Sequence, residues 1–310
     1  MQGLIVKGIG GFYYVKTEEG VYECKARGIF KKDGTVAMVG DIVDIDVMEG
    51  EEAGWGLGNT RDEEKQDAFV GKAWISAIHE RRNSFIRPPV ANIDCFLIVL
   101  AAADPEPNLP LIDRFLVMAE QSKTDAVLCI NKCDLVSDKY LDELKKIYEG
   151  VYPLVLASAQ NGVGIEELKS LLKGKTIALA GPSGVGKSTI VNALHPAALM
   201  ETGSISSKTK RGKHTTRHAE IFETDFGAMI FDTPGFTSFD VLDAEEGKLQ
   251  LYYPEFAEYL GKCRYDNCRH YKEPDCAVRQ AVRDGKISKS RYLSYKAQIA
   301  EIRQREENKY

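Results

Sequence analysis

The sequence contains no apolar run that approaches the roughly 18 residues of a membrane-spanning helix. A secretory signal is also lacking, because Lys7 and several glycines break the short apolar pieces at the start and no cleavage pattern follows. The 7 cysteines are odd in number and unevenly placed, which argues against a disulfide framework. We therefore expect a cytoplasmic protein without a membrane partner.

The rest of the composition is ordinary for a folded soluble chain. A length of 310 residues, 44% of them hydrophobic and 28% charged, allows two or three domains, each with its own core. The net charge is −5, yet the segment Gly261–Tyr310 carries thirteen basic and seven acidic residues. A basic terminal segment on an acidic chain indicates a localised contact with nucleic acid.

A glycine-rich segment lies between the apolar run Thr176–Ala180 and the helix-compatible run Ile190–Leu194. Its G-x-x-x-x-G-K-S spacing is typical of a loop whose backbone N–H groups, with the positive end of a helix, bind phosphate. Lys187 is expected to reach the β- and γ-phosphates, and the Ser188 hydroxyl to coordinate Mg²⁺. The residues expected to bind nucleotide here are Gly181, Pro182, Ser183, Gly184, Val185, Gly186, Lys187, Ser188 and Thr189.

A second motif, N-K-C-D, follows the apolar run Ala126–Ile130. The carboxylate of Asp134 can accept hydrogen bonds from guanine N1–H and the exocyclic amine, a donor pair that adenine lacks. Asn131 is expected to hold this motif against the phosphate loop, and the stem of Lys132 to lie along the base. The tetrapeptide alone is a weak signal, but a Ser-Ala pair follows the next apolar strand, Val151–Leu156. Together they predict a guanine pocket of Asn131, Lys132, Cys133, Asp134, Ser158 and Ala159.

A third motif, D-T-P-G, ends the apolar strand Ala228–Phe231. Asp232 is expected to hold Mg²⁺ through water, and the Gly235 N–H to sense the γ-phosphate. The basic segment between the phosphate loop and this motif supplies the threonine that such sites use as a second Mg²⁺ ligand. We favour Thr216, with Thr215 as the alternative.

The group that positions the attacking water differs from the one in Ras. Phe236 stands where Ras has a water-positioning glutamine, so intrinsic hydrolysis is expected to be slow. His214 is the candidate catalytic residue within the chain, because an imidazole can accept or relay a proton near neutral pH. The alternatives for His214 are an exposed loop histidine or an RNA contact.

The order of the motifs is rotated. In Ras-like GTPases the phosphate loop comes before the guanine-reading motif, whereas here it follows, so the chain is circularly permuted. In these motifs and their order, the sequence resembles the RsgA family, also known as YjeQ, over essentially its whole length. The resemblance implies binding to the small ribosomal subunit during its late assembly, with rRNA as the main contact surface. It also implies that the ribosome stimulates GTP hydrolysis and that GDP favours release.

The first 88 residues are predicted to be all-β. Five short strands separated by glycine and Asp-Gly turns favour a small barrel of the OB type. Basic residues gather near its end, at His79–Asn83 and Arg87, where spacing alone fits an RNA contact or a solvated loop equally well. The family resemblance favours the RNA contact.

Beyond Pro88 and Pro89, strands and helices alternate, which predicts an α/β sheet with helices on both sides. The near-continuous apolar run Ile93–Ala101 predicts a parallel strand that is covered on both faces. Helices are predicted from about Leu109 to Gln121 and from Ile165 to Leu172.

The last part of the chain contains the pattern C-x4-C-x-H-x5-C. Three thiolates and one imidazole can close a tetrahedral zinc site without an open position, so the predicted zinc is structural and its ligands are Cys263, Cys268, His270 and Cys276. An amphipathic helix is predicted from about Ile287 onwards. Cys95, Cys129 and Cys133 are interpreted as buried core thiols.

The expected architecture is therefore an OB barrel (1–88), a circularly permuted α/β GTPase domain with a phosphate loop (89–242) and a mostly helical zinc-binding domain (243–310). The expected cofactors are Mg²⁺ with GTP and one Zn²⁺, the expected partner is the small ribosomal subunit with its rRNA, and the expected state is a monomer. One alternative is an RNA-binding assembly scaffold in which GTP is only a structural ligand. Another is a GTPase acting on a different RNA, such as tRNA.

Overall fold

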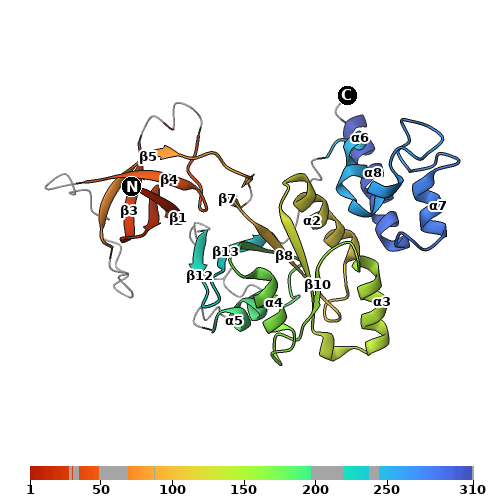
Figure 1. Cartoon of the computed structure of the whole chain (residues 1–310), viewed down its shortest axis with the longest axis horizontal. Helices are drawn as coiled ribbons and strands as arrows, with labels where there is room; N and C mark the ends of the chain where they lie inside the picture. Colours follow the sequence, from red (N-terminus) through yellow and green to blue (C-terminus); the bar gives the residue numbers. More distant parts are fainter. Residues whose placement is uncertain are drawn as a thin grey trace. The chain divides into compact units, whose positions relative to one another are not determined.

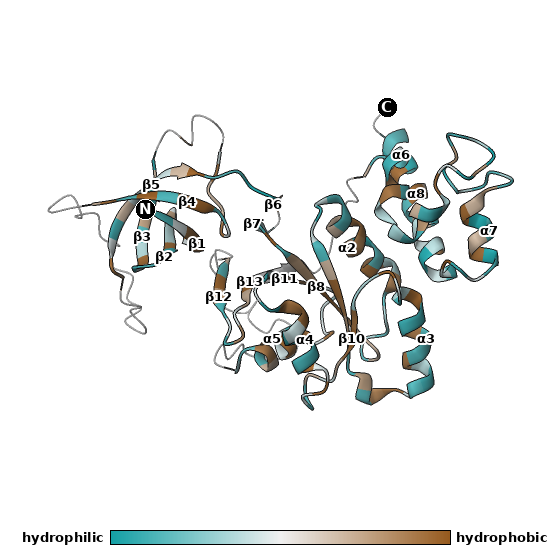
Figure 2. Cartoon of the chain, viewed as in Figure 1, coloured by the Kyte–Doolittle hydropathy of each residue, from teal (hydrophilic) through white to brown (hydrophobic). Residues whose placement is uncertain are grey.

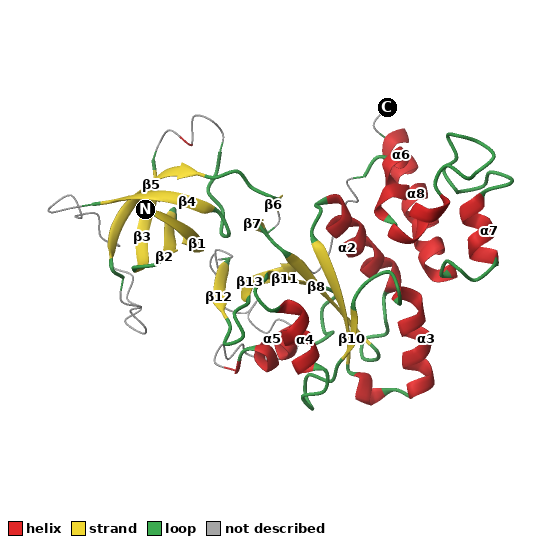
Figure 3. Cartoon of the chain, in the orientation of Figure 1, coloured by secondary structure: helices red, strands yellow, loops and turns green. Residues whose placement is uncertain are grey.

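The computed structural model describes residues 1–27, 30, 35–48, 69–86, 88–196, 219–236 and 244–308, without the side chains of 232–235. The chain divides into two compact units. The first comprises Met1–Ile93, Arg211–Glu223 and Met229–Gly235, and the second comprises Asp94–Lys210, Thr224–Ala228 and Phe236–Tyr310. The first unit is built from strands, whereas most helices belong to the second (Figure 3). Every helix in the described ranges is too short or too polar to cross a membrane.

The first unit contains a closed five-stranded barrel (Figure 1). The strands follow the order β1-β2-β3-β5-β4, and β4 pairs back onto β1. Only β3 and β5 run parallel, and the other neighbours are antiparallel. The predicted OB-type barrel is thus confirmed, and its strands are β1 (Gln2–Ile9), β2 (Phe12–Thr17), β3 (Gly20–Ala26), β4 (Ile42–Val47) and β5 (Gly71–Ile78).

Side-chain alternation separates the inside of the barrel from its outside. Inward positions on different strands, such as Val15, Cys24 and Val43, are fully buried. Because successive strand residues point to opposite faces, the intervening residues of each strand face outward. The barrel interior is therefore apolar, while polar and aromatic side chains stand on its outer surface.

Three of the basic residues near the end of the barrel have structural partners, and Arg87 lies outside the described residues. Arg81 donates from Nε to Asp41 Oδ1 at 2.7 Å and from Nη2 to Asp41 Oδ2 at 2.8 Å. His79 Nε2 lies 3.1 Å from Asp44 Oδ2, and Arg82 donates to the Asn92 carbonyl at 3.3 Å. These contacts fix the chain on both sides of the hairpin β6 (Ser84–Ile86) and β7 (Pro89–Ala91). Arg81 in particular already has a buried carboxylate partner, so it is a poor candidate for an RNA phosphate contact.

Two further strands accompany the barrel. β12 (Glu220–Glu223) pairs antiparallel with β13 (Met229–Phe236), and β1 pairs with β12 at Lys7 and Glu220. Strand β13 continues through Phe236, five residues beyond the predicted end at Phe231. The predicted strand was too short because Pro234 and Gly235 read as turn residues in the sequence.

The second unit contains four parallel strands in the order β10-β9-β8-β11. β8 is buried along its whole length, as the apolar run predicted, and appears brown in the hydropathy view (Figure 2). Strand β11, which leads into the phosphate loop, is the last of these four strands in the chain but pairs with β8, the first of them. The strands are β8 (Cys95–Ala101), β9 (Asp125–Asn131), β10 (Leu154–Leu156) and β11 (Thr176–Ala180).

The helices that follow these strands are α2 (Leu109–Gln121), α3 (Asp138–Tyr148), α4 (Ile165–Leu172) and α5 (Lys187–Leu194). Helix α2 has the predicted bounds. Strand β10 is shorter than the predicted Val151–Leu156, because the N–H groups of Val151 and Tyr152 bond back to Tyr148 at the end of α3. Pro153 then lacks the N–H that a strand would use.

The C-terminal part of the second unit is mostly helical, as predicted. It contains α6 (Glu246–Leu249), the short 3₁₀ helices η5 (Gln250–Tyr252) and η6 (Pro254–Tyr259), α7 (Ala277–Arg283) and α8 (Lys289–Glu307). Its apolar core is continuous with Val117 of α2.

The final helix predicted from about Ile287 is α8, and its residues Tyr292, Tyr295, Ile299 and Ile302 lie in the buried core. The buried face of α8 includes polar Arg291, Ser294 and Gln298 beside Tyr295 and Ile299. Arg291 is completely buried because Asp113 and Glu255 bind its guanidinium. Tertiary ion pairing therefore allows a charged residue to share the buried face with the apolar residues of the helix.

Candidate nucleotide site and metal centre

The phosphate loop connects β11 to α5, and two of its glycines adopt backbone conformations that other residues rarely adopt. Gly181 and Gly186 both have positive φ, at 142° and 93°. A Cβ at Gly181 would lie 2.2 Å from the Val99 carbonyl oxygen, and a Cβ at Gly186 would lie 2.4 Å from Asn131 Nδ2. Larger residues are excluded at both positions, so the glycines are required by close packing as well as by backbone conformation.

Lys187 lies at the first position of α5, with its ammonium group turned back over the loop. Nζ donates to the carbonyls of Gly181 at 2.7 Å and Pro182 at 2.6 Å. Burial lowers the pKa of Lys187 to about 8. An anionic phosphate at this position would favour the protonated form, because opposite charges at close range stabilise each other.

Asn131 ties the base-reading motif to the phosphate loop. Its side chain is buried, its Nδ2 donates to the Val185 carbonyl at 2.8 Å, and its Oδ1 accepts from the Ala159 N–H at 3.1 Å. One amide thus joins three segments that are separate in the sequence: the N-K-C-D motif, the Ser-Ala pair and the phosphate loop. The structure brings these predicted site segments together in the second unit.

Lys132 also connects the N-K-C-D motif to the phosphate loop. It adopts a left-handed conformation with φ of 61°, and its Nζ donates to the carbonyls of Gly184, at 3.0 Å, and Asp104. The Asp104 contact was not expected from the sequence, because the loop after β8 carries no recognisable nucleotide motif. Pro105 lies beside Gly184, 3.6 Å from the position of an added Cβ.

The remaining base-pocket residues differ in exposure. Asp134 is exposed, and its carboxylate has no hydrogen-bond or ion-pair partner among the described residues. Ser158 is buried, and its Oγ accepts from Asn161 Nδ2 at 3.0 Å. An exposed carboxylate at the edge of a packed loop is available for an incoming base.

Several predicted switch residues lie outside the described parts of the chain. His214, Thr215 and Thr216 fall in the undescribed segment, and of Asp232 and Gly235 only the backbone, within β13, is described. Ser188 is in the first turn of α5. The three predicted Mg²⁺ ligands therefore remain predictions.

Phe236 is well defined and has a structural role. It is buried, and its ring meets Phe96 edge to face with centroids 5.0 Å apart. Its carbonyl accepts the N–H of Gly181 at 3.0 Å, next to the start of the phosphate loop. A side chain packed into the core in this way cannot orient a water molecule.

The cysteines near the parallel strands divide into two groups. Cys95 and Cys129 are completely buried, and burial raises the pKa of both thiols. The interpretation of Cys133 as a core thiol was wrong, because it lies in the short helix η2 (Cys133–Leu135) and is partly exposed. It follows the buried part of β9, where the chain has already left the sheet.

Four potential metal ligands converge in the C-terminal part of the second unit. The ligand atoms of Cys263, Cys268, His270 and Cys276 all lie within 4.8 Å of one another. His270 Nδ1 is 3.5 Å from Cys263 Sγ, 3.5 Å from Cys268 Sγ and 3.3 Å from Cys276 Sγ. Ligands at ordinary Zn–S and Zn–N distances form tetrahedra with edges of about 3.6–3.8 Å, so this cluster fits a four-coordinate zinc ion.

The orientation of the His270 ring is set by Gln250, a residue that sequence analysis missed. Gln250 Oε1 lies 2.7 Å from His270 Nε2 and accepts its proton. The Nδ1 lone pair is then free to face the three sulfurs, which is the arrangement that a metal-binding histidine needs. No sequence signal identified Gln250, because it precedes the first cysteine of the motif by thirteen positions.

Helix α8 and Glu273 hold the backbone of the metal loop. Tyr292 and Tyr295 donate their hydroxyls to the carbonyls of His270, at 2.8 Å, and Arg269, at 2.7 Å. Burial alone would raise the pKa of Glu273, but backbone N–H groups of Arg269, Tyr271 and Lys272 bind its carboxylate and lower the pKa. The loop is thus preorganised by residues that do not touch the metal position.

Two protein-family models match different parts of the chain, and both describe RsgA proteins. The model of the RsgA GTPase family matches residues 78–242, and that of the RsgA N-terminal domain matches residues 2–55. The first match alone covers more than half of the chain. The chain belongs to the RsgA GTPase family.

Individual RsgA-family proteins match along their full length. The small ribosomal subunit biogenesis GTPase RsgA of Agathobacter rectalis is 45% identical, with 99% of each chain covered. The protein of the same name from Caldanaerobacter subterraneus subsp. tengcongensis is 42% identical, over 100% of this chain and 98% of its own.

Solved structures agree with the fold. The crystal structure of YjeQ from Thermotoga maritima shares 35% identity and a TM-score of 0.79, over 97% of this chain and 98% of that one. YloQ, described as a circularly permuted GTPase, shares 32% identity and a TM-score of 0.76, over 98% and 95%. This RsgA-family chain is therefore a circularly permuted GTPase, and the predicted fold class is confirmed.

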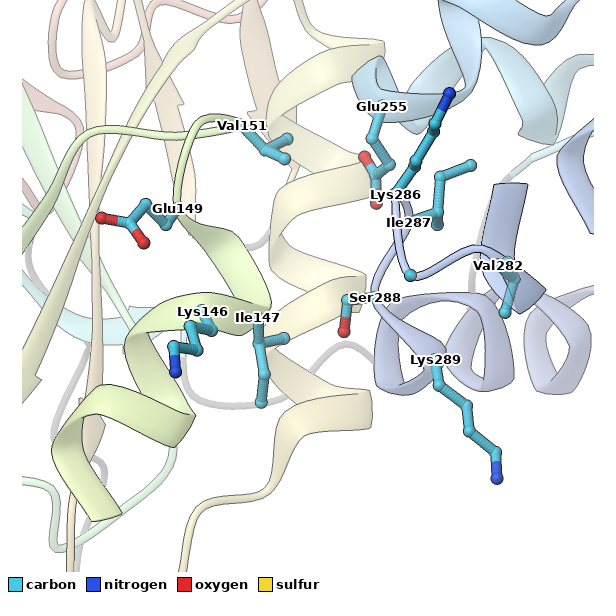
Figure 4. Close-up of a pocket in the computed structure, with 11 residues that line it drawn as sticks. Lys146, Ile147, Glu149, Val151, Glu255, Val282, Lys286, Ile287, Ser288 and Lys289 are labelled. Atoms are coloured by element: carbon cyan, nitrogen blue, oxygen red, sulfur yellow. The ribbon is translucent and has the colours of Figure 1, made fainter. Parts of the chain in front are cut away.

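A separate cavity of about 320 Å³ lies between the end of α3 and the loop before α8 (Figure 4). Lys146, Lys286 and Lys289 line it, but their side chains point away from one another in Figure 4. Glu255 on the same wall is already bound by Arg291 through two hydrogen bonds. The lysines do not converge on a common anion, so we assign no ligand to this cavity.

Proposed function

We propose that this GTPase hydrolyses GTP to GDP and phosphate as a late-stage assembly factor of the small ribosomal subunit. The observation that carries the proposal is the Asn131 amide, which links the guanine-reading motif to the phosphate loop through Val185 and Ala159. This link supports a single nucleotide site built from both motifs. The relatives from Agathobacter rectalis and Caldanaerobacter subterraneus, each named a small ribosomal subunit biogenesis GTPase, support the ribosomal role.

Within this proposal, the phosphate loop and the guanine pocket have distinct tasks. The backbone of Gly181–Thr189 and the ammonium of Lys187 bind the phosphates, and Asp134 accepts the guanine donors. Asn131 and Lys132 hold the two sets of groups in register, which positions the γ-phosphate for attack. Ser158 and Ala159 close the side of the base pocket, with Cys133 within the motif.

Mg²⁺ would be held by Ser188, by Thr216 or its neighbour Thr215, and by Asp232 through water. When bound, it would neutralise the charge that develops on the phosphates. The Gly235 N–H would sense the γ-phosphate. We assign these roles from the motif spacing and not from observed coordination.

Slow intrinsic hydrolysis follows from Phe236, which is buried against Phe96 and leaves the water-positioning task to another group. His214 is our candidate within the chain, because its imidazole could accept or relay a proton. The small subunit would then accelerate hydrolysis by placing the His214 imidazole beside the attacking water.

The Cys₃His cluster would hold one structural zinc ion, because all four tetrahedral positions are filled by protein ligands. We propose that the barrel and the basic C-terminal segment provide the rRNA contacts. The charge balance of Gly261–Tyr310, thirteen basic against seven acidic residues, supports the second contact. Such a protein would act in the cytoplasm as a monomer with three domains, 1–88, 89–242 and 243–310.

The test is GTP hydrolysis by the purified protein alone, with isolated small subunits and with isolated large subunits. We expect slow turnover alone and a large acceleration by the small subunit only. A His214→Ala variant should retain nucleotide binding and lose most of the stimulated rate, because general acid–base groups contribute about 10²–10⁴-fold.

Equal, slow turnover in all three reactions would contradict the proposal. Tight GTP binding without turnover would then favour an assembly scaffold for which GTP is a structural ligand. Acceleration by another RNA, such as tRNA, would favour a GTPase with a different partner.

A further inference from the structure

The outer surface of the barrel carries aromatic and lysine side chains in register. Strand β2 presents Phe12 outward, β3 presents Lys25 and β5 presents Trp74. The register places Phe12 opposite Lys25, and Lys25 opposite Trp74. We refer to Phe12, Lys25 and Trp74 as the aromatic row.

Burial confirms that the aromatic row faces outward. The neighbours of Lys25 and Trp74 along their strands, Cys24 and Ala73, are completely buried in the barrel, whereas the three row residues are partly exposed. Lys25 Nζ lies 4.6 Å from the centroid of the Phe12 ring. Because strands are spaced about 4.8 Å apart, Phe12 and Trp74 lie roughly 10 Å apart across the row.

The neighbouring outward row of the barrel contains Tyr14, Glu23 and Lys72, and its tyrosine is covered by another side chain. Tyr14 lies opposite Glu23, and Glu23 opposite Lys72. The ring of Phe69 covers Tyr14, with centroids 5.1 Å apart, so Tyr14 is buried. Tyr14 is thus covered, whereas Phe12, Trp74 and the covering Phe69 ring each keep part of their surface exposed.

Local charges also favour an anionic partner at the aromatic row. Asp46, the acidic residue opposite Trp74 on β4, is paired with Arg27 Nη2 at 2.6 Å. Lys25 lies within the row, whereas Lys72, two residues before Trp74 on the same strand, stands opposite the acidic Glu23 of β3. The cation within the row is therefore Lys25, although the barrel region as a whole is acidic.

This composition matches single-stranded nucleic acid better than a duplex or a protein. Unpaired bases stack on aromatic rings, and lysines between the rings contact the phosphates that link the bases. Duplex bases are already stacked on one another and offer no free faces. The face also lies on strands of an OB barrel, a fold whose strand surface binds oligonucleotides elsewhere.

We propose that the aromatic row binds unpaired RNA bases by stacking on Phe12 and Trp74, with Lys25 contacting the phosphate backbone. The inference rests on the proposed function, because it assigns one part of the proposed rRNA contact. It goes further by naming the conformation of the RNA, single-stranded, and the three residues that recognise it.

Intrinsic tryptophan fluorescence tests the proposal directly. The chain has 2 tryptophans, so Trp55→Phe in the full-length protein leaves Trp74 as the sole reporter. A labelled twelve-nucleotide single-stranded RNA would be titrated with anisotropy and Trp74 emission recorded together. We expect saturable quenching of Trp74 that follows the anisotropy change, because a stacked base quenches an indole.

Substitutions at the other two positions separate stacking from charge. Phe12→Ala should weaken binding about 5- to 160-fold, the range for loss of one base–aromatic stack, while Phe12→Tyr should restore it. Lys25→Ala should weaken binding and reduce the salt slope, log affinity against log salt, by about 0.7.

Ile42→Ala is the matched control. Ile42 is an exposed outward residue of β4 at the end of that strand away from Asp46, so its loss should leave RNA binding unchanged. Circular dichroism and thermal melting would establish that each variant is folded, and the conservative Phe12→Tyr variant keeps the test valid if Phe12→Ala does not fold.

Three outcomes would overturn the proposal: no RNA binding by anisotropy, binding without any change in Trp74 emission, or equal binding and quenching by a duplex of the same sequence. Hydrolysis stimulated by the small subunit is measured separately. If stimulation persists while Trp74 emission stays constant, the aromatic row is wrong and the proposed function stands. If stimulation is absent, the proposed function itself fails.

Discussion

The ammonium group of Lys187 lies within the phosphate loop, where it bonds to the carbonyls of Gly181 and Pro182. Burial costs the charged form some of its hydration, so the free protein releases this proton at a pH of about 8, well below the usual value for lysine. Nucleotide phosphates favour the charged form. At the proposed nucleotide site, proton binding and nucleotide binding would therefore be linked.

Affinity for a non-hydrolysable GTP analogue should fall about tenfold between pH 7 and pH 9, because less Lys187 is protonated above its pKa of about 8. Isothermal calorimetry at several pH values would measure this. The contribution of Lys187 to the stability of the free protein changes with pH in the opposite direction to the affinity. Between pH 8 and the unfolded pKa only the unfolded chain keeps the proton, so this contribution rises with pH.

The matched control for this pH dependence is Lys187→Met, which should bind weakly and without this slope while guanine's own titration is unchanged. A wild-type affinity that stays constant from pH 7 to pH 9 would show that Lys187 does not respond to the phosphates.

A second residue-scale prediction concerns Gln250, whose Oε1 accepts the Nε2 proton of His270. Gln250→Ala should lower zinc affinity about 10- to 100-fold, since the ring would lose the partner that fixes its orientation and tautomer. Competition with a chromophoric chelator would measure the affinity. Gln280→Ala is the control, because Gln280 bonds to Arg283 and Asp284 on the surface of α7. Equal affinities for the two variants would rule out a positioning role for Gln250.

At the scale of elements, helix α8 is joined to α2 through one buried guanidinium. Arg291 donates to Asp113 of α2 at 2.8 Å and to both carboxylate oxygens of Glu255 in η6, at 2.7 and 3.1 Å. The ring of Tyr253 lies 4.6 Å from the Arg291 guanidinium carbon. Burial raises the pKa of Asp113, and the neighbouring Arg291 opposes this rise. The arrangement stabilises only one relative placement of these helices.

Arg291→Met should destabilise the protein by about 3–5 kcal/mol, because it leaves two carboxylates buried without their cation. Urea unfolding would measure the change. Arg264→Met is a matched control: Arg264 makes a 3.0 Å ion pair with Asp275, but both side chains are about two-thirds exposed, so its loss should cost at most about 1 kcal/mol. Similar losses for the two variants would mean that the buried cluster has no special role in joining α8 to α2.

Adding Asp113→Asn to Arg291→Met should recover part of the lost stability, since one unpaired buried charge is removed. A double variant less stable than the sum of the two single changes would contradict this account.

At the scale of the whole molecule, only the C-terminal part of the chain should depend on the metal for its stability. The C-terminal core, which includes Phe256, Val278 and Tyr295, packs around the metal loop. The barrel has its own apolar interior, formed by residues such as Ile5 and Val43. Loss of the proposed zinc ion would therefore remove a constraint from the C-terminal core and leave the barrel core intact.

Chelation of zinc should abolish hydrogen-exchange protection in 263–276 and in α7, because the four ligands would repel or separate without their ion. Protection of the barrel strands β1 to β3 should be unchanged. Exchange mass spectrometry with and without chelator would measure both regions. Unaltered protection in 263–276 would contradict a structural role for the metal.

The sequence determined the features that depend on neighbouring residues. The bounds of α2, α4 and β11 were predicted correctly, because apolar periodicity and flanking glycines act locally. The four metal ligands lie within fourteen positions, so their spacing was sufficient to predict a cluster that could bind zinc. The rotated motif order was sufficient to predict the permuted fold.

Only the tertiary structure decided which polar side chains have partners. Arg81 and Arg291 are ordinary basic residues in the sequence, yet each binds a buried carboxylate that lies 40 or 178 positions away. Phe12, Lys25 and Trp74 form a row because β3 lies between β2 and β5 in the barrel. The physical reason is the same in each case. Ion pairing, burial and side-chain stacking depend on distances in space, and only the folded chain brings residues so far apart in sequence together.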